Sequence, residues 1–209
     1  MPYFLDWLLE RTQFIEISAY SDDVAYTIFE TMNDRGLSLT QSEMLKGFIL
    51  SRIGVETTRT ECSRVWKREM QSISTIDKDA EQDFFRTWFR SRYALKTRSG
   101  SNSVEQDYDR MGPEFHRWFK DTLVPQQDMK SEDFERFVLV DLPYYSKWYR
   151  KARSAAKSFD TDLPSVYYNA TREPSLKQEM LLLSPLDPSD DDETTLFKMR
   201  LVSHFLDIF

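Results

Sequence analysis

Two short stretches of this sequence combine residue types that could do chemistry, and the first interleaves arginines with aromatic residues. Its basic members are Arg86, Arg90, Arg92, Lys96 and Arg98. Cations hold phosphate groups and aromatic rings stack on bases, so these residues are candidates for DNA contact. The alternative is an amphipathic helix that buries Phe85, Trp88 and Phe89 and turns a basic face to solvent. The aromatic spacing favours this alternative.

The second stretch is the quartet Asn33, Asp34, Arg35 and Gly36, which separates two apolar helical patterns. Asn and Gly are ordinary turn residues, and Gly36 can adopt the left-handed conformation that ends a helix. Asp34 and Arg35 add a carboxylate and a planar cation that matches phosphate geometry. Residue chemistry alone leaves a turn and a nucleotide or DNA site equally open.

Other reactive residue types have simpler interpretations. The five glycines form no phosphate-binding loop, and Glu114 and His116 share a spacing that is common without a metal. The acidic run 190–193 could attract a divalent cation. Acids at a helix start also stabilise the helix through its dipole, and this second interpretation is favoured. Cys62 lies on an apolar helix face and is most simply a core residue. No catalytic residue is identified, and no metal site is predicted.

The elements that would position these side chains are mostly helices, because apolar residues recur at helical spacing along the chain. The quartet lies in a predicted helical hairpin whose second helix is capped by Thr40 or Ser42. We expect a mainly α, multi-helix bundle-like domain, with at most a short strand near residues 13–18. Further helices are predicted over 57–73, 79–96, 104–123 with a break at Gly112-Pro113, 131–157 with a kink at Pro143, two short segments within 158–190, and 190–209.

Composition narrows the classes of protein that are compatible with the sequence. The chain has 209 residues and a net charge of −7, but residues 51–100 carry 11 basic against 7 acidic groups. A whole-chain basic surface for nucleic acid is therefore excluded, while a local one is not. The single cysteine permits no internal disulfide and fits a reducing, cytoplasmic compartment. No apolar run is long enough to predict a membrane span.

The segment IFETMNDRGLSLTQSEMLKGFIL carries the pattern Phe29-x-x-x-Asn33-x-x-Gly36-x-x-Leu39. This pattern resembles the signature of the GmrSD-type restriction endonuclease N-terminal domain family, over about residues 12–53. The resemblance implies a prokaryotic DNA-defence protein that restricts modified DNA. Family members carry an Asp-Gly-Gln-Gln-Arg motif tied to nucleotide hydrolysis, and many carry an HNH-type nuclease domain. This sequence contains neither feature.

We therefore expect a helical fragment of such a protein, with neighbouring N-terminal and C-terminal domains of the same protein as its partners. Residues 1–53 would end the nucleotide-motif region, and residues 54–209 would form a helical domain. The resemblance places Asn33, Arg35 and Asp34 toward a nucleotide or DNA site, while Phe29, Leu37 and Leu39 would hold the turn. No cofactor is expected in the fragment; an NTP and a divalent cation would belong to the intact protein. The alternative is a non-catalytic DNA- or protein-binding scaffold.

Overall fold

The computed structural model describes residues 2–13, Tyr20, Val24, Ile28, 39–94, 107–173 and 177–208. The chain divides into two compact units, Met1–Ser38 and Leu39–Phe209. In the first unit, helix α1 spans Pro2–Arg11, and Val24 and Ile28 are helical, as the predicted first helix of the hairpin requires. Apart from Gln13, which lies outside any strand, the predicted strand near 13–18 falls outside the described residues.

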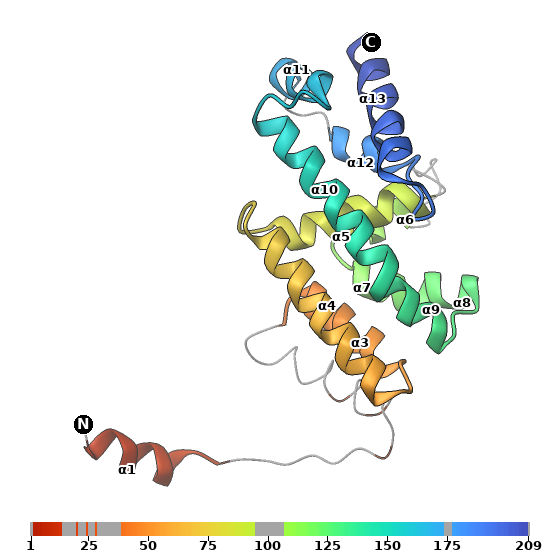
Figure 1. Ribbon diagram of the computed structural model, residues 1–209. Helices are drawn as coiled ribbons and strands as arrows, with labels where there is room; N and C mark the ends of the chain where they lie inside the picture. The colour runs from red at the N-terminus through yellow and green to blue at the C-terminus, as the bar shows by residue number, and fades with distance from the viewer. Residues whose placement is uncertain are drawn as a thin grey trace, which may run out of the picture. The chain divides into compact units, whose positions relative to one another are not determined.

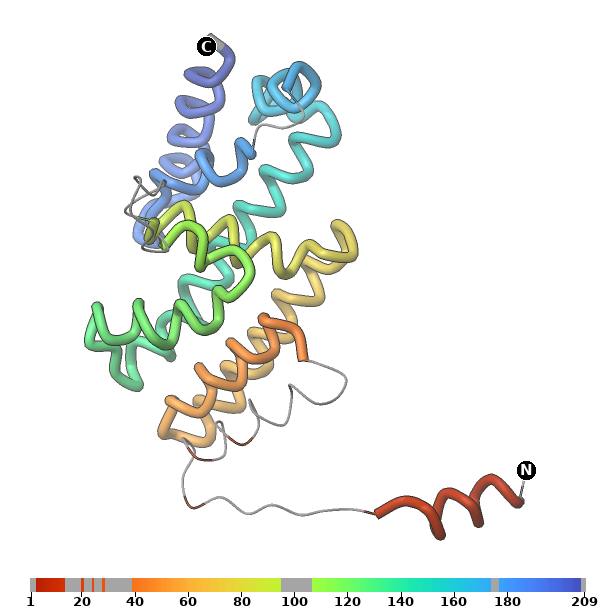
Figure 2. The backbone as a smooth tube through the Cα atoms, turned by 180° about the vertical axis from the view of Figure 1, so that it is seen from behind, coloured from red at the N-terminus to blue at the C-terminus, as the bar shows by residue number. Residues whose placement is uncertain are grey.

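The second unit begins with α3, which spans Gln41–Ser51. The backbone N–H of Glu43 donates to the Thr40 hydroxyl, and the Glu43 carboxylate accepts from the Thr40 backbone N–H at 2.8 Å. This reciprocal cap satisfies N–H groups that a helix start leaves unpaired. Of the two predicted caps, the structure selects Thr40. From behind, α3 lies against α4 (Figure 2), so α3 packs within the second unit.

Helices α4 and α5 carry the aromatic core. They span Glu56–Ser74 and Ala80–Tyr93, which confirms the helices predicted at 57–73 and from residue 79. Figure 1 shows α10 crossing both of them. Trp88 stacks between the rings of Phe137 and Tyr145, with centroid distances of 4.8 and 4.9 Å. The predicted inward residues are buried: Cys62, Val65, Trp66, Met70, Phe84, Phe85, Trp88 and Phe89.

The predicted helix over 131–157 consists of α9 (Ser131–Arg136), the π-helical turn η2 (Phe137–Asp141) and α10 (Leu142–Lys157). Ser131 is of a residue type that often caps helices, but the cap position is occupied by Lys130. The backbone N–H of Leu142 reaches back to the Phe137 carbonyl, one residue further than in an α-helix. Pro143 has no N–H with which to continue the regular pattern. The distortion predicted at Pro143 therefore takes the form of a π turn just before it.

The segment before it repeats this arrangement. Helix α6 spans Asp107–Arg110, α7 spans Phe115–Trp118, η1 is a second π turn over Phe119–Leu123, and α8 spans Val124–Gln127. The turn between α6 and α7 contains Gly112-Pro113, as predicted. Pro125 follows η1 just as Pro143 follows η2. The rings of Phe119 and Phe137 meet edge to face at 5.1 Å and join the two π turns.

Three helices complete the unit beyond α10: α11 (Pro164–Arg172), α12 (Gln178–Leu183) and α13 (Asp192–Ile208). The acidic run before α13 makes helix-start contacts. The Asp191 carboxylate accepts from the Thr194 backbone N–H at 2.7 Å, and the Asp190 carboxylate accepts from the Lys198 ammonium at 2.6 Å. The interpretation of this run as a helix start is confirmed.

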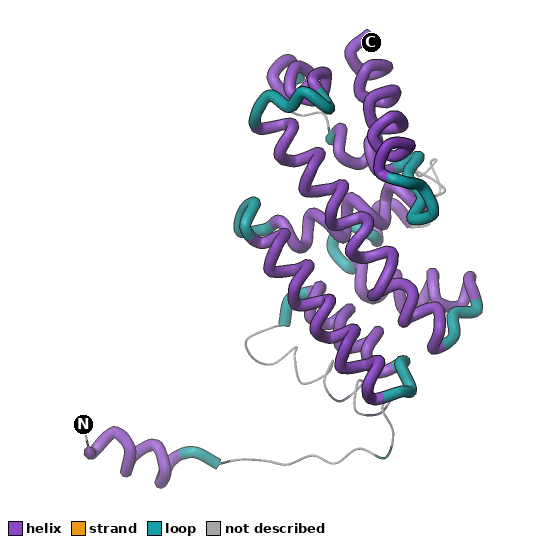
Figure 3. Tube along the Cα trace, in the orientation of Figure 1, coloured by secondary structure: helices purple, strands orange, loops and turns teal. Residues whose placement is uncertain are grey.

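The predicted fold class, a mainly α multi-helix domain, is confirmed. Helices joined by short loops make up nearly all of the described chain, and no strand occurs in that part (Figure 3). Aromatic rings from α4, α5, α7, η1, η2 and α10 fill its centre. None of the helices in the described ranges is both long and apolar enough to pass through a membrane.

Candidate functional site

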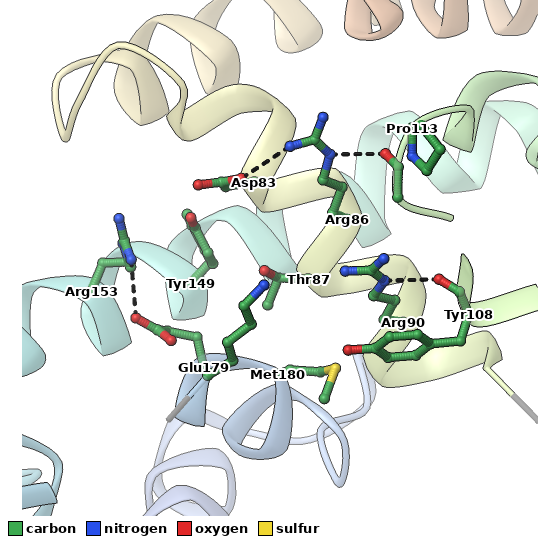
Figure 4. A pocket seen from close by; sticks show the side chains of 12 residues that line it. Asp83, Arg86, Thr87, Arg90, Tyr108, Pro113, Tyr149, Arg153, Glu179 and Met180 are labelled. Carbon is green, nitrogen blue, oxygen red and sulfur yellow. Dashed lines mark hydrogen bonds and ion pairs between the residues drawn. The ribbon is translucent and has the colours of Figure 1, made fainter. Parts of the chain in front are cut away.

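A pocket of about 330 Å³ opens between α5, the α6–α7 turn, α10 and α12. Figure 4 shows side chains from all four segments facing this space. Helix α5 supplies Arg86 and Arg90, α6 supplies Tyr108, and α10 supplies Tyr149 and Arg153. Lys177, Glu179 and Met180 close it from the α12 side. Segments more than 90 residues apart in sequence thus build one cavity, in the size range of small-ligand sites.

Arg86 ties α5 to the α6–α7 turn. Its Nε donates to the Gly112 carbonyl at 2.9 Å, one Nη donates to the Gln82 side-chain oxygen at 3.1 Å, and another lies 3.4 Å from the Asp83 carboxylate. These partners take up most of its donors and balance its charge. Arg86 therefore shapes the pocket wall more than it offers a free cation.

Arg90 is held differently, because its guanidinium is fixed mainly by neutral groups. Its Nε donates to the Tyr108 carbonyl at 3.0 Å, and its Cζ lies 4.2 Å from the centre of the Tyr108 ring. A Cβ built on Gly112 would come within 2.6 Å of Arg90 Nη2, so a side chain there would displace the guanidinium. The carbonyl and the ring of Tyr108 hold Arg90 in place, and the absence of a side chain at Gly112 leaves room for its guanidinium.

The opposite wall is formed by α10 and α12. Arg153 pairs with Asp77 at 2.9 Å and with Glu179 at 3.3 Å. Two carboxylates therefore offset its single positive charge. Tyr149 is 1% exposed overall, and burial raises the pKa of its phenol. A phenol is already protonated at neutral pH, and the raised pKa keeps its O–H as a donor further into the alkaline range.

The balance of charges leaves this pocket positive. Each of three carboxylates pairs with an arginine: Asp83, Glu179 and Asp77. Arg90 and Lys177 have no carboxylate partner within the part of the chain that the structure describes. Two cations in a partly enclosed, low-dielectric space attract an anion more strongly than the same cations on an open surface.

The structure separates the predicted basic residues. Arg86 and Arg90 line the pocket, whereas Arg92 points elsewhere, 3.9 Å from the Asp187 carboxylate and 6.0 Å from the centre of the Tyr145 ring. Lys96 and Arg98 lie outside the described residues. The neighbouring aromatic residues Phe85, Trp88 and Phe89 are fully buried, so they stack on one another and not on a ligand. The amphipathic-helix interpretation of this stretch is therefore correct for the aromatics.

The quartet of predicted site residues, Asn33, Asp34, Arg35 and Gly36, falls outside the described residues, as do Phe29 and Leu37. Leu39 is described and half-buried, directly before the cap of α3. Their assignment to a nucleotide or DNA site therefore stays a prediction.

Of the residues that line the pocket, the sequence predicted only Arg86 and Arg90 as site residues, and it missed Tyr108, Tyr149, Arg153 and Lys177. Each of these residues has an ordinary neighbourhood in the sequence, and only the packing of α6, α10 and α12 around α5 brings them together. One signal was available: Gly112 lies in a predicted helix break, and a glycine there permits close approach of a side chain. In the described ranges, no group of three or more His, Cys, Asp or Glu side chains could hold a metal ion.

A second, smaller pocket of about 140 Å³ lies beside the two π turns. Tyr93, Arg136 and Asp141 are among the residues that line it. Burial raises the pKa of the Asp141 carboxyl to about 6, although Arg136 opposes the shift. This pocket is less than half the volume of the first, and Arg92, one of the two cations that lower the pKa of its carboxyl, lies 3.9 Å from the Asp187 carboxylate.

Comparisons with known proteins add no name to this geometry: no protein-family model, no curated protein and no solved structure matches the chain.

Proposed function

We propose that this chain is the helical section of a prokaryotic, restriction-type DNA-defence protein, and that it supports DNA recognition or cleavage driven by NTP hydrolysis in the intact cytoplasmic protein. The family resemblance at Phe29, Asn33, Gly36 and Leu39 is the basis for the DNA-defence assignment. It makes Asn33, Asp34 and Arg35 candidates for a site completed by neighbouring domains. The helical section itself acts as a binding module without catalytic residues of its own.

The observation that carries a binding role is the positive pocket. Arg90 and Lys177 face a cavity in which every carboxylate is already paired with an arginine. Phosphate is the anion that DNA presents, and arginine is the side chain best suited to hold it. The pocket therefore offers phosphate contact even though the whole chain carries a net charge of −7.

The test compares two arginines of the same helix. Arg90→Gln should weaken binding of a short DNA at low salt by about tenfold or more, because a charged hydrogen bond contributes about 1.5–3 kcal/mol. It should also flatten the salt dependence by roughly one phosphate contact. Arg92→Gln removes the same charge from α5 outside the pocket and should leave binding within twofold. Equal losses, or no DNA binding by the unmodified chain at low salt, would remove this role.

The nucleotide part of the proposal has its own test. NTP hydrolysis by the intact protein should fall strongly when Asn33 is changed to Ala, with circular dichroism used to establish that the variant is folded. Unchanged turnover in a folded variant would remove Asn33 from the site and leave the turn as its only role.

The second candidate function is a non-catalytic scaffold that binds another protein. One observation favours it: α13 turns Phe197 and Leu201 to solvent, 63% and 62% exposed, one helical turn apart. Exposed apolar side chains in a row are typical of protein-binding faces. If pulldown of the neighbouring domains of the same protein fails after Leu201→Glu while DNA binding is unchanged, the scaffold function gains and the pocket loses its priority.

A further inference from the structure

We infer that the pocket between α5, α10 and α12 binds a phosphate monoester, meaning a terminal phosphate of a nucleic acid or the phosphate of a mononucleotide, rather than the continuous diester backbone of DNA. This inference rests on the proposed function only in that it uses the same pocket. It adds the ligand class and assigns Arg90 and Lys177 as the residues that hold it.

The first argument is charge stoichiometry. Arg86 is balanced by Asp83, and Arg153 is balanced by Asp77 and Glu179. Within the described part of the chain, Arg90 and Lys177 are the lining cations that no carboxylate balances. A phosphate monoester carries close to two negative charges at pH 7, whereas each diester carries one. The side chains that line the pocket sum to two positive charges, because four cations face the two carboxylates of Asp83 and Glu179, and this excess matches one monoester. Asp77, which pairs with Arg153 but does not line the pocket, lowers the local excess to one.

The second argument is shape together with the charges at the rim. The cavity of about 330 Å³ is the size of a small-ligand site, so it admits one group and not a duplex. Asp83 and Asp77 remain partly exposed beside it, with 47% and 38% of their side chains accessible. A strand carries one phosphate about every 3.4 Å, so a backbone that crossed the pocket would meet these carboxylates. A chain end that enters the pocket avoids them.

The third argument is that the main cation is already in place. The Tyr108 carbonyl holds Arg90 Nε, and the Tyr108 ring covers the guanidinium (Figure 4). Gly112 leaves the space that Nη2 occupies, since an added Cβ would come within 2.6 Å of it. An arginine fixed in this way loses little conformational freedom when it binds, which favours affinity for a small ligand. Thr87 lines the same wall and adds a hydroxyl donor.

The experiment uses isothermal titration calorimetry in a phosphate-free buffer, with four probes. They are a 5′-phosphorylated trinucleotide, the same trinucleotide with a 5′-hydroxyl, a nucleoside monophosphate and inorganic phosphate. We expect the phosphorylated trinucleotide to bind at least tenfold more tightly than its 5′-hydroxyl form. If the mononucleotide binds equally well, the natural ligand is a nucleotide. If inorganic phosphate alone binds equally well, the pocket recognises only the phosphate group.

Two variants and one control connect binding to the pocket. Lys177→Gln and Arg90→Gln should each weaken binding of the phosphorylated probe about tenfold, and Arg92→Gln should not change it by more than twofold. Lys177 is exposed and precedes α12, so its variant keeps the test valid even if Arg90→Gln disturbs the α6–α7 turn. Binding should also weaken below pH 6, where the monoester gains a proton.

The outcomes separate this inference from the proposed function. Equal binding of the phosphorylated and 5′-hydroxyl trinucleotides would overturn the monoester inference and leave DNA contact at the pocket intact. Binding of long DNA that is insensitive to Lys177→Gln and Arg90→Gln, with no binding of any short probe, would overturn the pocket as a phosphate site. Preference for the phosphorylated probe that is lost in both pocket variants supports the inference.

Discussion

Helices α5 and α13 carry apolar residues at the same spacing, yet the two stripes lie in opposite environments. On α5, Phe85 and Phe89 are four residues apart and fully buried. On α13, Phe197 and Leu201 are also four residues apart, and each is more than 60% exposed. Helix α13 buries a different stripe instead, which includes Met199.

The difference follows from the number of neighbours that each helix has. Helix α5 lies at the centre of its unit and contacts α3, α4, α7, α10 and α12, so its whole apolar face is covered. Helix α13 lies at one end of the unit beside α11 and α12. A helix that is apolar on more than one face buries only the face that meets a neighbour. The spacing of apolar residues in the sequence identifies an apolar stripe on a helix. The neighbouring helices decide whether that stripe is buried in the core.

The largest expected effect comes from the aromatic centre of α5. Trp88→Ala should lower the free energy of unfolding by about 3–5 kcal/mol, because it removes a fully buried indole stacked on two rings. The measurement is urea denaturation followed by circular dichroism. Phe197→Ala on α13 is the matched control and should change stability by less than about 0.5 kcal/mol. Similar losses in both variants would mean that the α13 stripe is covered too.

The next effect divides α13 into its two faces. Met199 is fully buried, so Met199→Ala should lower the free energy of unfolding by about 2–4 kcal/mol. The same urea titration measures it. If Met199→Ala has no effect, α13 does not pack on α11 and α12 in solution, and the comparison between the two helices loses its basis.

A smaller effect is expected on the pH dependence of stability, through the carboxylates of Asp187 and Asp141. Hydrogen bonds from Ser189 lower the pKa of Asp187 near the start of α13, whereas burial beside Tyr93 of α5 raises the pKa of Asp141 from 3.8 to about 6. The folded state therefore binds more protons than the unfolded state between about pH 4 and 6, so the Asp141 contribution to stability falls as pH rises through this range.

Asp141→Asn should remove that fall. After allowance for the partial exposure of Asp141, the variant should gain about 1–2 kcal/mol relative to the unmodified chain as pH rises from 4 to 7. The check is urea denaturation at several pH values, with Asp187→Asn as the control. Parallel pH profiles for Asp141→Asn and the unmodified chain would show that Asp141 is well solvated.

The smallest effect is expected on the exposed face of α13. Leu201→Ala should change the free energy of unfolding by less than about 0.5 kcal/mol, since the side chain is 62% exposed. Sedimentation velocity should at the same time show whether the variant associates less than the unmodified chain. A loss above 1 kcal/mol would mean that this stripe is covered within the folded chain.

The sequence predicted helices more accurately than it predicted the site. Periodicity located α4, α5 and α10, because Trp66, Trp88 and their neighbours recur at helical spacing and are in fact buried. The break at Gly112-Pro113 was also predicted correctly. The sequence did not predict the residues that share the pocket with Arg90, because Tyr108, Arg153 and Lys177 come from α6, α10 and the start of α12 and meet α5 only in the folded chain. Long-range packing of this kind leaves no local pattern.

The predicted basic stretch shows the same limit in detail. Arg90 and Arg92 are two residues apart, so on a helix they point in directions about 200° apart. One reaches the pocket and the other reaches Asp187. Local composition could describe both as basic, but it could not say that they serve different surfaces.

The π turn at Phe137–Asp141 has a consequence for the length of this chain. Each π turn holds about one residue more than an α turn, and every α residue adds roughly 100° of rotation. The five residues of η2 therefore rotate the helix about as much as four α residues would, and the buried Tyr145 keeps the orientation of a regular helix that is one residue shorter. Deleting the exposed Val140 should restore a regular helix and leave the aromatic face of α10 in the core. The π turn thus accommodates an extra residue without rotating the faces of the helices on either side of it.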